Sequence, residues 1–225
     1  MLVFISRLTI IFFIFFTNPV IAKCNFKTSD QIDNLTNLNN IKKIEIEVQN
    51  NRKWTKNAFD IIKDDNSTIQ IKNKKKFDSN IKIIFNFGFC NYYGKIRVSG
   101  DKKDHLDLDN GNLKASLDVE LKKGNINSST KFKLFLPKTR NGNNEIFTTS
   151  LLKKLGFIAP ETFYVDIKLN ELEYKALFQE KSVKELLEKN LRVEGPIFEG
   201  DEEILWQNQK NMKFASMNLE KLSGS

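Results

Sequence analysis

The segment LKASLDVEL, residues 113–121, decides the class of fold, because apolar and polar side chains alternate along it without a break. Alternate side chains of a β-strand point to opposite faces of a sheet, so this pattern predicts a strand with one buried face. Further strands are predicted on both sides of it, at 44–48, 67–72, 81–89, 93–98 and 132–136. Up to Pro137 the chain is therefore expected to be almost entirely β, with a charged loop at 101–112.

After Pro137 the spacing of the apolar residues changes. Two segments have helical spacing, and Gly156 supplies a stop for the first of them. The elements expected outside the first group of strands are helices at 54–62, 145–155 and 181–190 and a hairpin of strands at 163–169 and 174–179. The sequence thus predicts an α+β fold with an antiparallel sheet and a few short helices.

Residues 1–22 have the layout of a cleavable secretory signal peptide. Arg7 precedes an apolar run from Leu8 to Phe16, and the segment ends at Ala22. The run is too short to cross a membrane, which takes roughly 20 apolar residues. We therefore expect an exported protein that is periplasmic, cell-surface or extracellular, with no integral membrane span after cleavage. An uncleaved N-terminal anchor is the alternative.

Two cysteines, Cys24 and Cys90, follow the leader. In an exported protein an even number of cysteines favours a disulfide, and this one would tie the mature N-terminus to the apolar segment 81–89. Two free thiols are the alternative. No metal ligands are assigned, because a zinc site needs more ligands than two cysteines and the single histidine, His105, supply.

The charge of the chain favours a solvated surface over a nucleic-acid interface. Lys and Arg number 36 and Asp and Glu 28, which gives a net charge of +8. Only five of the basic residues are arginine, whereas base recognition and bidentate phosphate binding usually depend on arginine. We therefore expect no nucleic-acid partner.

An acidic loop around Asp104, Asp107 and Asp109 superficially resembles a calcium-binding loop. Counted from Asp107, Gly111 falls at the fifth position and Asp118 at the twelfth, whereas an EF-hand needs Gly at the sixth and Glu at the twelfth. A solvated acidic turn is therefore expected here, and a divalent-ion site is the alternative.

A series of short motifs begins at residue 97. The motifs are R-x-x-G at 97–100, K-x-S at 114–116, LGFIAP at 155–160, and a strand pair with Asn170 at its turn and Glu180 at its end. In their order and spacing, over about residues 93–205, these motifs resemble the N-terminal part of the CotH kinase-like family of spore-coat and secreted proteins.

The resemblance implies an atypical protein-kinase-like fold, of which this chain would hold the β-rich N-terminal lobe, and it implies ATP and Mg²⁺ as cofactors. Lys114 or Lys133 would neutralise phosphate charge. Glu180 would orient that lysine or face the nucleotide, and Arg97 and Arg140 would bind phosphate or hold a loop. The substrate would be an exported protein or a component of the envelope.

The resemblance is incomplete in two respects. Asp118 and Glu120 stand where the family strand usually carries basic residues. The family's catalytic base and magnesium ligands lie in a C-terminal lobe, beyond residue 225. The expected organisation is a signal peptide at 1–22, a flexible arm at 23–40, a kinase-like lobe at 41–205, and a tail at 206–225 that would begin the missing lobe.

Two classes of function are consistent with these patterns. If the native chain is longer, it would be a secreted ATP- and Mg²⁺-dependent protein kinase; otherwise it would be a nucleotide-binding or degenerate lobe. The alternative is a non-catalytic periplasmic or cell-surface module, whose Lys-rich face binds anionic polymers of the envelope.

Overall fold

The computed structural model describes residues 23–26, 38–66, 68–109, 112–193 and 195–196. Its strands are β1 (Lys23–Phe26), β2 (Ile41–Val48), β3 (Phe77–Phe85), β4 (Gly88–Val98), β5 (Leu106–Asp109), β6 (Asn112–Ala115), β7 (Leu117–Leu121), β8 (Lys131–Phe135), β9 (Thr162–Leu169) and β10 (Leu172–Glu180). Its helices are α1 (Asn51–Lys63), α2 (Asn143–Lys154) and α3 (Lys184–Lys189), with 3-10 turns η3 (Leu38–Asn40), η4 (Ile71–Asn73), η5 (Lys103–His105) and η6 (Pro137–Arg140). The expected signal peptide and the tail at 206–225 lie outside these residues.

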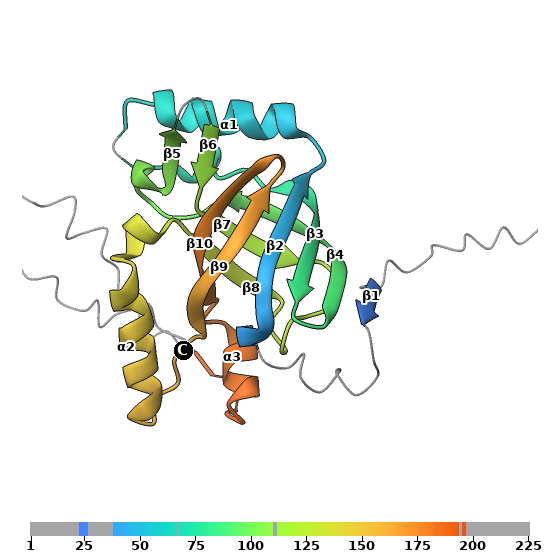
Figure 1. Cartoon of the computed structure of the whole chain (residues 1–225). Helices are drawn as coiled ribbons and strands as arrows, with labels where there is room; N and C mark the ends of the chain where they lie inside the picture. Colours follow the sequence, from blue (N-terminus) through green and yellow to red (C-terminus); the bar gives the residue numbers. More distant parts are fainter. Residues whose placement is uncertain (1–22, 27–37, 67, 110–111, 194, 197–225) are drawn as a thin grey trace, which may run out of the picture.

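Seven strands close into a mixed barrel (Figure 1). Hydrogen-bonded neighbours follow the order β4, β3, β2, β9, β10, β8 and β7, and a further pairing of β7 with β4 closes the ring. Among the described pairings in the barrel, only that of β2 with β9 is parallel. β1 lies outside the ring and pairs with the first residues of β4.

This architecture corrects the expected fold class, because the antiparallel sheet of a kinase-like lobe is replaced by a closed mixed barrel. The parallel pairing joins positions far apart in the chain, for instance Lys43 and Asp166. Local alternation predicts which side chains of a strand are buried, but it carries no information on which distant strand lies beside it. Closure pairs the backbone groups that an open sheet would leave at its edges.

The interior of the barrel is packed with apolar side chains. Its fully buried members include Ile44, Ile46, Ile83, Ile96, Leu117, Phe132, Leu134, Ile167 and Phe178. The ring of Phe178 stacks on Phe132 at 5.0 Å and on Phe163 at 4.7 Å between centroids. Because the interior is filled, functional groups are expected on the outer wall and at the two ends.

The helices cover different parts of the barrel (Figure 1). α1 lies across one end, where the hairpin of β5 and β6 also lies, and it buries Trp54, Ala58 and Ile61 at helical spacing. The side chain of Asn50 caps this helix by accepting a hydrogen bond of 3.1 Å from the amide of Lys53. α2 runs along the side of the barrel, and α3 lies near the end opposite α1.

Most of the predicted elements are present, with four corrections. The predicted strand 81–89 runs across a turn at residues 86–87, so its residues belong to β3 up to Phe85 and to β4 from Gly88. The predicted strand 113–121 is broken at Ser116 into β6 and β7, and the Ser116 hydroxyl accepts a hydrogen bond of 2.9 Å from the amide of Leu136. The predicted strand 67–72 holds η4 and an isolated bridge at Thr68 instead. The predicted loop 101–112 contains η5 and β5, because β5 pairs with β6 as a hairpin.

The predicted disulfide between Cys24 and Cys90 is confirmed. The two cysteines lie directly opposite each other in the pairing of β1 with β4, and residues 23–26 of the expected arm form β1. Within the described residues, we find no helix with the length and apolar character that a membrane crossing requires. The disulfide is compatible with an exported protein.

Candidate functional site

Charged side chains gather on the outer wall formed by β4, β7 and β8. Their apolar neighbours point into the barrel, so residues 95, 97, 118, 120 and 131 point outward. A small groove of about 120 Å³ lies among them. It is lined by Lys76, Lys95, Ile96, Arg97, Asp118, Glu120, Lys131 and Lys181. We call it the cationic groove, because five cationic side chains line it with only two carboxylates.

The register of the three strands explains the arrangement of charges. Glu120 of β7 lies between Lys95 of β4 and Lys131 of β8. In the next outward row, Asp118 lies between Arg97 and Lys133. Opposite charges directly across neighbouring strands attract each other, so each row stabilises this register.

Asp118 holds the guanidinium of Arg97 in place. Its Oδ2 accepts hydrogen bonds from Nε of Arg97 at 2.9 Å and from Nη2 at 2.6 Å, and Nζ of Lys181 lies at 3.3 Å. Asp118 is only 9% exposed, so these charge-assisted contacts satisfy a carboxylate largely removed from water. Arg97, predicted to bind phosphate or hold a loop, is therefore oriented by a neighbouring strand.

Glu120 is the second carboxylate of the groove. It accepts hydrogen bonds from Nζ of Lys76 at 2.8 Å and from Nζ of Lys122 at 3.1 Å. These two lysines, chiefly Lys76, lower the pKa of Glu120 to about 2. Glu120 is thus ionised at neutral pH and organises two lysines, and Lys95 forms an ion pair of 3.6 Å with Asp78, which is not part of the groove lining. The groove keeps an excess of positive charge.

Lys133 and Arg140 lie next to the groove, over the ring of Phe135. The guanidinium of Arg140 lies 4.2 Å from the ring centroid and Nζ of Lys133 lies 5.5 Å from it. His105 contacts the same ring, with 5.9 Å between centroids. Phe135 is completely buried although it points away from the barrel interior, so these side chains cover an outward aromatic ring and gain cation–π attraction.

Glu180 and Lys114 lie near opposite ends of the barrel (Figure 1). Glu180 ends β10, close to α3. Its Oε1 accepts hydrogen bonds from Oγ of Ser129 at 2.7 Å and Nζ of Lys189 at 2.9 Å, and its Oε2 accepts one from the amide of Glu161 at 2.9 Å. Lys114 lies in the hairpin near α1, opposite Asp107. The structure therefore does not bring Lys114 to Glu180.

The predicted site residues thus fall into three places. Arg97 lies in the cationic groove, Lys133 and Arg140 lie beside it over one ring, and Glu180 and Lys114 lie near the two ends. The described part of the chain has no group of three or more His, Cys, Asp or Glu placed to hold a metal. These five residues do not converge on one position, so as a set they do not form a single site for the phosphates of ATP.

Sequence reasoning missed most of the groove, namely Lys76, Lys95, Asp118, Glu120, Lys131 and Lys181. A signal was present: the outward positions read K-x-R in 95–97, D-x-E in 118–120 and K-x-K in 131–133. Basic, acidic and basic outward positions on three strands indicate rows of opposite charges across the sheet, provided that the three strands are neighbours. The neighbours became known only from the barrel.

Comparison with known proteins gives no family. No protein-family profile matches the chain, and no curated protein matches it. The CotH kinase-like resemblance therefore stays a prediction.

Proposed function

We propose that this protein is a non-catalytic module, exported to the periplasm or the cell surface, that binds anionic envelope polymers in the cationic groove. The observation that carries the proposal is the excess of five cationic side chains over two carboxylates in one groove on the barrel wall. The disulfide supports an oxidising compartment.

The size of the groove favours a polymer over a small molecule. Its volume of about 120 Å³ is below the roughly 300 Å³ at which pockets for small ligands begin. The cations come from four segments of the chain: β4, β8, the segment before β3 and the segment after β10. A chain with repeated negative charges can contact several of them at once.

The chemistry of the cations points to reversible binding. Four of the five are lysines, whose ammonium groups are strongly hydrated point charges without the planar fork of arginine. Attraction between such exposed groups and a polymer is screened by salt. The proposed binding is therefore electrostatic, of modest affinity, and tolerant of the detailed structure of the polymer.

The test uses the mature full chain and immobilised polygalacturonate, a polymer with one carboxylate per sugar. The groove variant Lys95→Gln/Lys131→Gln removes two charges and leaves the partners of Asp118 intact. The control variant Lys53→Gln/Lys56→Gln removes the same charge from exposed positions on α1. We expect the groove variant to lose binding, the control to retain it, and both curves to weaken as salt rises.

Two results would overturn the proposal. Equal losses in the two variants would mean that only the overall charge of the protein attracts the polymer. Binding that persists at about 1 M salt, where the Debye length is near 3 Å, would mean that the contact is not electrostatic.

A further inference from the structure

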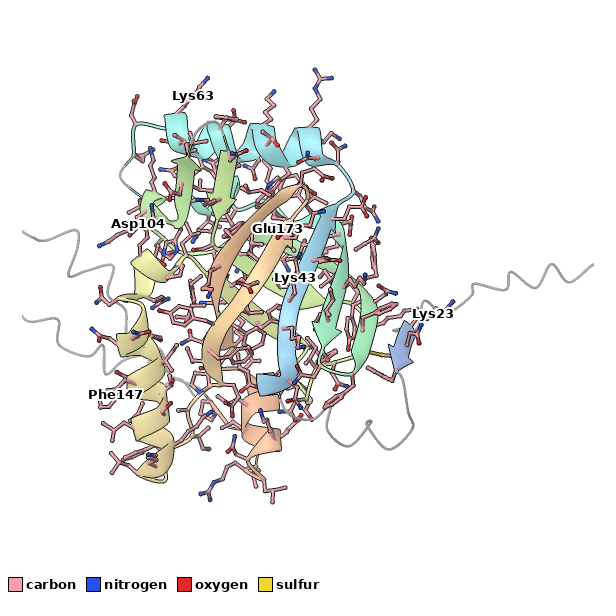
Figure 2. The ribbon with its side chains drawn as sticks, viewed as in Figure 1. Lys23, Lys43, Lys63, Asp104, Phe147 and Glu173 are labelled. Atoms are coloured by element: carbon pink, nitrogen blue, oxygen red, sulfur yellow. A yellow bond between two sulfur atoms is a disulfide. The ribbon has the colours of Figure 1, made fainter. Side chains whose placement is uncertain are left out.

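A second surface, independent of the groove, carries exposed apolar side chains. Phe147, Leu151 and Leu155 recur at intervals of four residues, so they lie on one face of α2 and its last turn. They are 68%, 42% and 62% exposed, and Phe157, directly after the helix, is 62% exposed. Figure 2 shows Phe147 on the side of α2 turned away from the barrel. We call these four residues the apolar stripe.

The stripe is unusual for a helix packed on a barrel. A surface helix normally turns its apolar side chains to the core, whereas in α2 only Thr149 is buried. Contiguous exposed apolar side chains commonly mark a surface that another segment or molecule covers. We therefore expect another segment or molecule to cover the apolar stripe.

A cavity of about 340 Å³ continues the stripe between the end of α2 and α3. Phe157, Ile158 and Leu186 supply apolar lining, and the cationic lining comes from Lys153, Lys189 and Arg192. Glu161 and Glu180 also line the cavity and pair with Lys153 and Lys189, so Arg192 supplies its surplus positive charge. An occupant suited to stripe and cavity together would be apolar and would carry negative charge.

The chain itself continues from this cavity. Asn190 and Arg192 line it, and the described residues end at Pro196. The residues after Pro196, 197–206, read IFEGDEEILW. Four acidic residues thus lie between the apolar pair Ile197-Phe198 and the apolar run ending at Trp206, which is the composition that stripe and cavity require.

We propose that segment 197–206 of the same chain binds over the cavity and the apolar stripe. Its acidic residues would lie near the lysines and arginine of the cavity, and its apolar residues would cover the stripe. The segment is long enough to follow the whole stripe, because ten extended residues span about 33 Å, whereas the twelve-residue helix α2 is about 18 Å long. The contact would be intramolecular, so it would form at any protein concentration.

The fluorescence of Trp206 can report whether the segment binds to the stripe. The only other tryptophan, Trp54, is 2% exposed in the core, so acrylamide quenching of the intact mature chain reports mainly on Trp206. We expect Trp206 to be protected, with its emission shifted to the blue relative to a free indole. The variant Phe147→Asp/Leu155→Asp should abolish the protection and shift the emission to the red.

The matched control is Ile71→Asp, which changes an 88% exposed apolar residue in η4, away from the stripe. It should leave the quenching unchanged, and circular dichroism should show that all variants are folded. Quenching of the unmodified chain equal to that of a free indole would overturn the proposal. Protection that appears only as concentration rises, together with a dimeric mass in sedimentation, would assign the stripe to a second copy and would also overturn it.

Discussion

Asp118 and Glu180 are both nearly buried carboxylates on barrel strands, and both are reached by a lysine from outside the barrel, yet their surroundings differ. Glu180 is 2% exposed, and its partners are a hydroxyl, a backbone amide and Lys189. Asp118 is 9% exposed, and its partners are the cations Arg97 and Lys181, which line a groove with surplus positive charge.

The difference distinguishes a carboxylate that stabilises the fold, Glu180, from one that orients cations for binding, Asp118. At Glu180 each oxygen accepts a hydrogen bond from within the protein, so this carboxylate ties β10 to its neighbours. At Asp118 the carboxylate orients cations whose charge it only partly balances. We therefore expect changes at Glu180 to reduce stability, and charge removal in the groove to reduce binding.

The largest effect is expected for Glu180→Ala. The change leaves Lys189 and Ser129 without their partner, and breaking a buried charged contact costs about 3–5 kcal/mol. Urea unfolding of the mature chain measures it. Glu173→Gln is the control, because Glu173 pairs with Lys43 at 2.8 Å on the exposed wall (Figure 2), and it should leave the midpoint unchanged. Equal midpoints for Glu180→Ala and the unmodified protein would contradict a structural role for Glu180.

A slightly smaller effect is expected from loss of the disulfide. Cys24 and Cys90 are 66 residues apart, and a bridge across a loop of this length stabilises by about 4 kcal/mol through restriction of the unfolded chain. Cys24→Ser/Cys90→Ser should lower the urea midpoint accordingly. A reducing agent should lower the midpoint of the unmodified protein equally and leave the double variant unaffected. If the reducing agent left the urea midpoint of the unmodified protein unchanged, the disulfide would not contribute to stability.

The smallest effect concerns Glu120 and pH. Lys76 and Lys122 lower its pKa to about 2, from an ordinary value of 4.5. Its contribution to stability is therefore present above about pH 4.5 and is lost as the pH falls toward 2. Because this carboxylate is partly exposed, the contribution is below about 1 kcal/mol.

Glu120→Gln should accordingly flatten part of the fall in stability between these pH values. Denaturant unfolding at a series of pH values measures the slope, and Glu171→Gln, at an exposed turn position, is the reference. If the free energy of unfolding fell more steeply with decreasing pH in Glu120→Gln than in the unmodified protein, the expected stabilising effect of ionised Glu120 would be contradicted.

The sequence predicted the local features of the barrel well and its closure not at all. Alternation along 113–121 and 163–169 predicted the buried faces of β7 and β9, and the even number of cysteines predicted the disulfide. The parallel contact of β2 with β9 and the contact of β4 with β7 depend on packing between distant segments, which no local period contains. The break at Ser116 was missed for a similar reason, since its hydrogen bond is to Leu136 on another strand.

The candidate site shows the same limit. Arg97 was selected by a motif and does lie in the groove, but Asp118 and Glu120 were noted only as departures from the family pattern. Their positions between cations of β4 and β8 depend on which strands are neighbours. The exposure of the apolar stripe could not be predicted either. Helical spacing at 147, 151 and 155 places these residues on one face but does not determine whether that face packs on the barrel or lies in solvent.

The most direct test of the central claim maps the polymer on the protein. Backbone amide resonances of the mature chain would be followed by NMR during titration with an oligomer of galacturonate. The account predicts shifts concentrated at residues 95–97, 118–120 and 131–133, and their disappearance when salt is raised. Shifts concentrated on α1 or on α2, with the resonances of the groove unchanged, would contradict it.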